Sequence, residues 1–164
     1  MASLTRSVAC LAFAGAAACA TSNRPSTSAG PTRWTGNFKA VSGSSAVLSR
    51  TTGSQGSASG NISVANADSV PPTSHVDLTV ALASLSSRQL AWAIFHGPCG
   101  SPTPPVAGLQ EFPPIDVTNG GAHVAADLRF RLDPGSDYHA NVYSSNRATD
   151  VSNVLMCTNL SLGR

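Results

Sequence analysis

Charged and aromatic side chains are scarce in this chain of 164 residues. Asp, Glu, Lys and Arg together make up 11% of the residues, Phe, Trp and Tyr make up 5%, and Lys39 is the only lysine. Long solvated helices need Glu, Lys and Arg on their outer faces, so this composition argues against them. The net charge of +2 is not gathered in a basic cluster, so no nucleic-acid partner is expected.

Small residues and turn formers are abundant instead. The chain has 14 glycines and 11 prolines, which favour many short strands separated by turns. The length predicts a single domain with one core. Of the four cysteines, two lie in the first 20 residues, so only two remain for the folded part.

The N-terminus has the features of a secretory signal. Residues 1–18 hold one early arginine and then an apolar segment that ends in small residues. Cys19 follows three alanines, which resembles the lipobox of bacterial lipoproteins and predicts a lipid anchor on Cys19. We therefore expect an exported protein held on a membrane of the bacterial cell envelope. Ordinary cleavage after Ala-x-Ala, which releases a soluble secreted or periplasmic domain, is the alternative.

Residues 19–33 are rich in Ser, Thr and Pro and have little to bury, so they are expected to form a flexible tether. Residues 34–164 form the expected domain. They contain no apolar run of about 18 residues that could cross a membrane.

Apolar residues recur every second position after the tether, which indicates half-buried antiparallel strands. The clearest strands are residues 75–83 and 123–132. In each of them apolar residues occupy one side, and His, Asp, Thr or Arg residues lie on the other. In residues 90–95 the inward set is Leu90, Trp92 and Ile94, and Ala91, Ala93 and Phe95 are expected to face outward. In residues 138–143 the inward set is Tyr138, Ala140 and Val142, and His139, Asn141 and Tyr143 are expected to face outward.

Weaker strands are expected at residues 36–41, 45–50, 59–65 and 154–160. The total of about eight strands suits a β-sandwich or barrel. Residues 119–121, Asn-Gly-Gly, and residues 133–136, Asp-Pro-Gly-Ser, predict tight turns. Residues 98–114 contain six prolines and are predicted to be a long surface loop.

Cys99 opens this loop and Cys157 lies in the last expected strand. A single pair of cysteines in an exported protein is most simply a disulfide. The bond closes a segment of nearly sixty residues, which the chain-entropy model values at about 4 kcal/mol.

The order of motifs resembles the copper/zinc superoxide dismutase family and the bacterial lipoproteins that share its domain. A strand ending in Trp-Ala-Ile-Phe-His-Gly-Pro-Cys-Gly, residues 92–100, leads into a Pro/Gly loop, and Val-Leu-Met-Cys, residues 154–157, lies near the C-terminus. The family has a His-x-His strand before a loop cysteine and a disulfide to a C-terminal cysteine. The resemblance implies an all-β Greek-key sandwich or barrel.

The same resemblance implies that the family's chemistry is missing. Its His-x-His pair matches Ala93 and Phe95, its later copper histidine matches Tyr143, and its active-site arginine matches Val154. Copper needs imidazole ligands in a fixed array, which Ala and Phe do not provide. Neither a catalytic residue nor a metal or other cofactor is therefore expected.

Two hypotheses concern the residues that stand where the family has its copper site. Phe95 and Tyr143 are expected to pack together with Phe112, either as a second small core or as an interaction patch for a small molecule or a protein. Alternatively, a non-family ligand set such as His96 and His139 binds copper or zinc.

The sequence thus predicts a non-enzymatic, exported and lipid-anchored envelope module for binding or structure, on a degenerate superoxide dismutase-like fold. One competing hypothesis is a copper- or zinc-binding protein or dismutase. Another is a different secreted β-sandwich, such as a chordin-like domain, which is also non-enzymatic. The identity of any protein or small-molecule partner is left open.

Overall fold

A computed structural model describes residues 31–41, 57–83, 88–146 and 153–163. The expected signal, Cys19 and the expected strand at residues 45–50 lie outside these ranges. Within them no helix is long and apolar enough to cross a membrane.

All regular elements of the described residues except one short 3₁₀ turn are strands, as the alternation and composition predict. The elements are β1 (Arg33–Ala40), β2 (Ala58–Ala67), β3 (Thr73–Leu82), β4 (Arg88–Leu90), β5 (Trp92–His96), a short 3₁₀ turn η1 (Leu109–Glu111), β6 (Ile115–Val117), β7 (Gly121–Leu128), β8 (Tyr138–Tyr143) and β9 (Val154–Leu162). β1 thus begins at the last residue of the expected tether.

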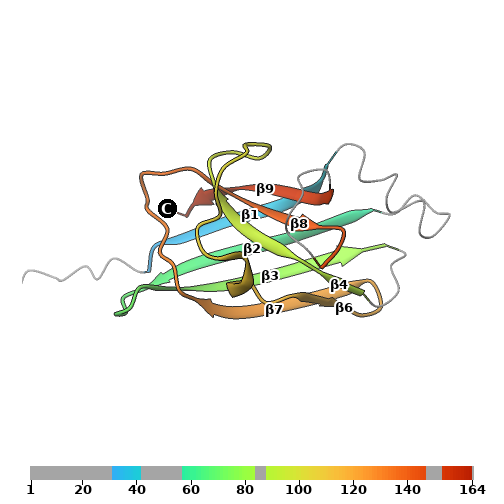
Figure 1. Cartoon of the computed structure of the whole chain (residues 1–164), viewed down its shortest axis with the longest axis horizontal. Coiled ribbons are helices and arrows are strands. Elements are labelled where there is room, and N and C mark those ends of the chain that lie inside the picture. The colour runs from blue at the N-terminus through green and yellow to red at the C-terminus, as the bar shows by residue number, and fades with distance from the viewer. Residues whose placement is uncertain (1–30, 42–56, 84–87, 147–152, 164) are drawn as a thin grey trace, which may run out of the picture.

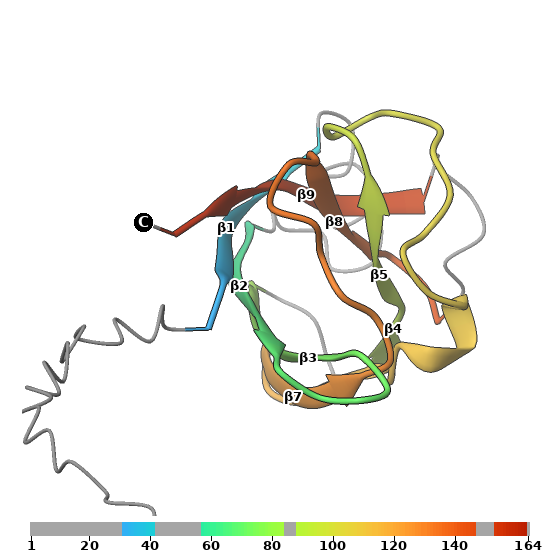
Figure 2. The same ribbon diagram turned by 90° about the vertical axis from the view of Figure 1, so that its left-hand side faces the viewer.

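Seven strands form one curled antiparallel sheet in the order β5-β8-β9-β1-β2-β3-β7 (Figure 1). β4 and β6 pair as a second, two-stranded antiparallel sheet. β4 is separated from β5 by one residue, Ala91, and β6 is joined to β7 by a two-residue turn. The small sheet therefore bridges the two edges of the large one, and the strands surround a single core (Figure 2).

Alternation correctly predicts the buried side of the two clearest strands. In β3, Val76, Leu78, Val80 and Leu82 are buried. In β7 and the segment after it, Leu128, Phe130 and Leu132 are buried, whereas Val124 and Ala126 are only partly buried. β7 ends at Leu128, four residues before the predicted end, and the chain then crosses one end of the core.

The half-buried pattern expected for residues 90–95 and 138–143 is wrong, because the outward side of each is buried as well as the inward side. Ala93 and Phe95 are buried, as are His139, Asn141 and Tyr143. Residues 90–95 are also not one strand, because Leu90 ends β4 in the small sheet and Trp92 begins β5 in the large one. The proline-rich loop pairs with the edge of β5 and is tied across the outer side to Cys157 on β9, so that side is not open to solvent.

Both predicted turns are present. Thr118 and Gly121 exchange backbone hydrogen bonds around Asn119 and Gly120, which have φ of 53° and 79°. These left-handed values at both central positions match a type I′ turn and explain the Asn-Gly pair. At the second turn, the Ser136 amide donates to the Asp133 carbonyl.

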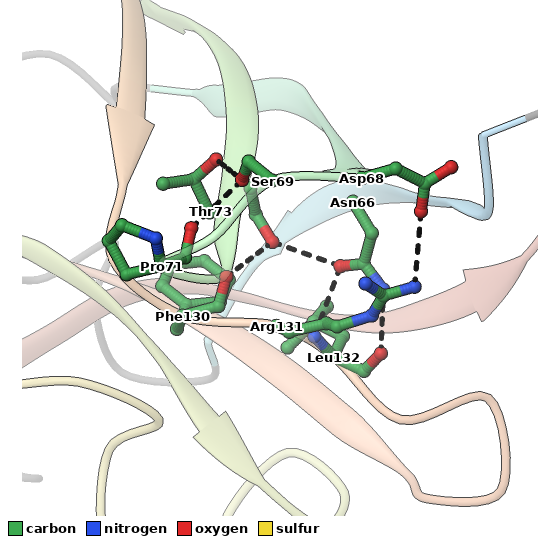
Figure 3. A network of polar contacts seen from close by, with 9 residues as sticks. Asn66, Asp68, Ser69, Pro71, Thr73, Phe130, Arg131 and Leu132 are labelled. Atoms are coloured by element: carbon green, nitrogen blue, oxygen red, sulfur yellow. Dashed lines mark hydrogen bonds and ion pairs between the residues drawn. The ribbon is translucent and has the colours of Figure 1, made fainter.

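A buried polar network holds the crossing segment in place (Figure 3). The Asn66 side chain donates to the Leu132 carbonyl at 2.8 Å and accepts from the Leu132 amide at 3.1 Å. The Ser74 hydroxyl bridges the Asn66 side-chain oxygen and the Phe130 carbonyl, each at 2.9 Å. These contacts replace the strand pairing that the chain loses after Leu128.

Candidate functional site

The outer face of β5 and β8 carries most of the residues that the sequence selects for function. Ala93 and Phe95 project from β5, and His139, Asn141 and Tyr143 project from β8. All five are at least nine-tenths buried, and we call this group the covered face. Two adjacent strands position it, because β5 and β8 pair in register with Ala93 opposite Asn141 and Phe95 opposite His139.

The proline-rich loop pairs with the free edge of β5 and also crosses this face to reach Cys157, which lies opposite Asn141 on β9. The Val106 amide donates to the Ile94 carbonyl at 3.0 Å, and the His96 amide donates to the Pro104 carbonyl at 3.4 Å. Pro105 forms an isolated bridge with Phe95. A sheet edge with unpaired amides attracts other strands, and a proline-rich segment satisfies those amides without continuing the sheet.

A disulfide between Cys99 and Cys157 fastens the start of the loop to β9, as the cysteine count predicts. The two Cα atoms are 6.1 Å apart. The Cys99 amide also donates to the Asn159 side-chain oxygen at 2.7 Å, which is a second link between the loop and β9.

The three aromatic residues expected to form one patch do not meet. Phe95 stacks on His139 with ring centroids 5.3 Å apart. Tyr143 lies four residues after His139 on β8, which at a rise of about 3.3 Å per residue separates the two by about 13 Å. Its amide donates to the Ala91 carbonyl. Phe112 packs in the main core, with its ring centroid 5.0 Å from that of Trp92. Phe95 and Phe112 therefore pack against different partners within one core, and the three aromatic side chains are buried and form no exposed patch.

His139 is a buried histidine held in one tautomer. Its Nδ1 donates to the Gly97 carbonyl at 2.8 Å. Burial lowers the pKa of His139 below its ordinary value of 6.5, although the hydrogen bonds to the backbone of Gly97 and His96 act in the opposite direction. His139 is therefore a neutral, structural side chain at pH 7.

The second expected metal ligand, His96, does not join it. Phe95 is the residue opposite His139, and His96 is opposite Tyr138, whose ring it contacts at 5.3 Å. Successive residues of a strand face opposite sides of the sheet, so His96 and His139 lie on different faces. In the part of the chain that the structure describes, no group of three or more His, Cys, Asp or Glu side chains is arranged to hold a metal ion.

Tyr143 and Asn141 form the polar part of the covered face. Burial raises the pKa of Tyr143, and a hydrogen bond from the Asn141 side chain partly offsets that effect. A phenol with a raised pKa stays protonated at neutral pH, so this pair acts as neutral hydrogen-bonding groups.

Two hollows lie beside the disulfide. The apolar hollow, of about 380 Å³, is lined by Val154, Asn141, Val41 and the loop residues Ser101 and Pro102. The polar hollow, of about 420 Å³, is lined by residues of β1 and β9 and by Cys99. Val154, which the resemblance alone aligns with an active-site arginine, therefore lines a cavity.

Of the residues that line these hollows, the sequence singles out only the two cysteines and Val154. Alternation places Asn141 on the outward side of its strand, and Lys39 stands out in the sequence only as the single lysine. Hydrophobic alternation cannot reveal a cavity formed by residues of three separate segments. The signals that the sequence does carry are the pair of cysteines, which both hollows share, and Val154 in the apolar hollow.

The remaining histidines lie elsewhere. His75 and His123 on β3 and β7 each contact a carboxylate, Asp127 and Asp77 respectively, at 2.8 Å. All four side chains are substantially exposed, so these contacts are surface pairs of small energetic weight.

Comparison with known proteins gives no match: no family model, no curated protein and no solved structure resembles this chain closely enough to be assigned to it.

Proposed function

We propose that the protein is a non-enzymatic module of the bacterial cell envelope, exported and anchored to a membrane through a lipid on Cys19, with a degenerate superoxide dismutase-like domain that serves binding or structure. The proposal takes its family from the motifs around Cys99 and Cys157. The fold and the disulfide are compatible with that family.

One observation supports the proposal that the protein is not an enzyme. The positions that match the family's copper ligands, Ala93, Phe95 and Tyr143, belong to the covered face and are buried under a loop that is bonded to β5 and β9. Phe95 packs on the one buried histidine, His139, whose Nδ1 is already engaged. Such packing favours a stable scaffold over a reaction centre open to substrate.

The decisive experiment measures metal content and dismutation together. The mature protein is isolated from its host and also loaded with copper and zinc, and bound metal and superoxide dismutation are measured. We expect neither stoichiometric metal nor activity above that of free copper. A stoichiometric metal with dismutase activity overturns the proposal.

The anchor has its own test. The chain and a Cys19→Ser variant are expressed in a bacterium that processes lipoproteins, and the cells are fractionated. We expect the wild type in the membrane fraction with the mass of attached acyl chains, and the variant without that mass. A wild type that is soluble and cleaved after an Ala-x-Ala site contradicts the anchor and leaves the domain's role unaffected.

A further inference from the structure

We infer that the groove beside the disulfide binds a small anionic amphiphile, with a carboxylate head and a short acyl chain. The inference rests on the proposed binding role and names its site and ligand class. The groove consists of the polar and apolar hollows, which adjoin at Cys99 and Cys157 because both residues line both hollows.

The groove follows the direction of β1 and β9. Lys39 lies opposite Cys157 in the register of these two strands, and Thr35 lies opposite Ser161. Val41 follows Lys39 by two positions, so the outward side of β1 runs from polar residues to an apolar one along the groove. The loop at Cys99 stands over β9, to which the disulfide joins it.

The polar end offers a single positive charge. Lys39 lines the polar hollow together with hydroxyl and amide side chains, among them Thr35, Asn37 and Ser161. Among the described residues, no Asp or Glu forms an ion pair with Lys39. A cation surrounded by neutral hydrogen-bonding groups is complementary to one carboxylate.

The apolar end suits a hydrocarbon chain. Val154 and Pro102 line it, and its polar lining includes Asn141, which is 8% exposed. Each hollow has the volume of a small-ligand site, which is about 300 to 1,000 Å³. A ligand with one charged head and one apolar tail satisfies both ends, whereas a sugar leaves the apolar end empty.

The experiment uses the full chain with Cys19→Ser, so that no attached lipid competes for the groove. Binding of three probes is measured by calorimetry and by shifts of backbone amide NMR signals: decanoate, acetate as the head alone, and decyl maltoside as a tail with a neutral head. We expect decanoate to bind more tightly than either other probe, with shifts at Lys39, Cys157 and Val154.

Four variants separate charge and tail recognition from general effects. Lys39→Gln is expected to weaken decanoate binding roughly tenfold, as the loss of one charge-assisted hydrogen bond implies. Lys39→Arg keeps the affinity. Arg129→Gln removes the same charge from an exposed position outside the groove and leaves the affinity unchanged. Val154→Thr keeps the side-chain volume but weakens binding of the tail.

Equal affinity for decanoate and decyl maltoside overturns the inference, as do equal effects of Lys39→Gln and Arg129→Gln or shifts outside the groove. Any of these results leaves the metal and dismutation experiment untouched, so failure of the groove is distinguishable from failure of the proposed function. Thermal unfolding of each variant verifies that its fold is intact.

Discussion

Asn66 is the residue on which the crossing segment depends. Its side chain satisfies both backbone groups of Leu132 and accepts from Ser74 in a site where Asn66 is 4% exposed. Asn66→Ala is expected to lower the free energy of unfolding by at least about 2 kcal/mol, because each buried polar group left unpaired costs about 1–3 kcal/mol. Urea unfolding measures the difference.

Asn61→Ala is the matched control, since Asn61 lies on the same strand but faces solvent. A surface substitution of this kind changes stability by less than about 0.5 kcal/mol. Similar losses for the two variants contradict the structural role given to the network.

His139 makes the stability of the fold depend on pH. Because its folded pKa lies below 6.5, the unfolded chain binds the proton more readily. The contribution of neutral, buried His139 to the free energy of unfolding is fully present above pH 6.5, and it is lost as the pH falls from 6.5 towards the pKa of His139 in the folded protein. His139→Gln is therefore expected to flatten the dependence of unfolding free energy on pH in that range.

Urea unfolding at a series of pH values measures this slope. His75→Gln removes an exposed histidine and serves as the control for a general effect of losing one imidazole. If wild type and His139→Gln lose stability in parallel as the pH falls, the burial of His139 does not govern the acid response.

The turn at Asn119 and Gly120 is the element that joins the small sheet to the large one. Gly120 has φ of 79°, and a Cβ atom there meets the Leu82 carbonyl oxygen at 2.7 Å. Gly100 has φ of 86° but no atom within 4 Å of such a Cβ. Gly120→Ala is therefore expected to destabilise the protein by about 1 kcal/mol or more beyond Gly100→Ala, because only the former adds a steric clash to backbone strain.

Thermal or urea unfolding of the two variants, each compared with the wild type, gives this difference directly. Equal destabilisation means that the neighbouring strand moves to accept the methyl group.

The loop and its disulfide act as one element. Joining residues 58 apart removes loop-closure entropy from the unfolded chain, which the chain-entropy model values at about 4 kcal/mol. The double variant Cys99→Ser, Cys157→Ser is expected to be less stable by about this amount, measured by urea unfolding. Reductant is expected to destabilise the wild type and leave the double variant unchanged, and a reductant effect on the variant contradicts this assignment.

How well the sequence predicts an element depends on whether one side of that element meets water. β3 has His75 and Thr79 on its outer side, and the prediction of its faces is confirmed. β5 and β8 are buried on both sides because a loop that follows β5 in the chain folds back over them. The sequence indicated this burial in part, because Ala93, Phe95 and Tyr143 are apolar or aromatic residues that are unfavourable on the solvent-facing side of a strand.

The candidate site could be predicted less well than the fold. The disulfide could be predicted by counting cysteines, because an exported domain with only two cysteines is expected to join them. The structure confirms this prediction. The register of β5 against β8, which separates Phe95 from Tyr143, depends on long-range pairing that no local pattern encodes. The position of Phe112 in the main core likewise depends on how the loop returns to Trp92.

At the scale of the whole molecule, the family resemblance predicts a geometry that can be tested by substituting histidines at the positions of the expected copper ligands. Ala93 lies opposite Asn141, two residues from Tyr143, so positions 93 and 143 are diagonal neighbours on one face. Position 95 follows on the same side of β5. If this face corresponds to the family's copper site, imidazoles at all three positions reach one copper ion across the separation of about 13 Å between positions 95 and 143 along the strands.

The triple variant Ala93→His, Phe95→His, Tyr143→His is therefore expected to bind copper and to be stabilised by it, although the larger residue at position 93 destabilises the metal-free form. Thermal unfolding with and without copper is the measurement, because a ligand that binds only the folded state raises the midpoint. The single variant Ala93→His, with one new imidazole in the same surroundings, is the control. A folded triple variant whose unfolding midpoint responds to copper no more than the single variant shows that the three positions do not share a metal-binding geometry, and the family assignment then loses its structural basis.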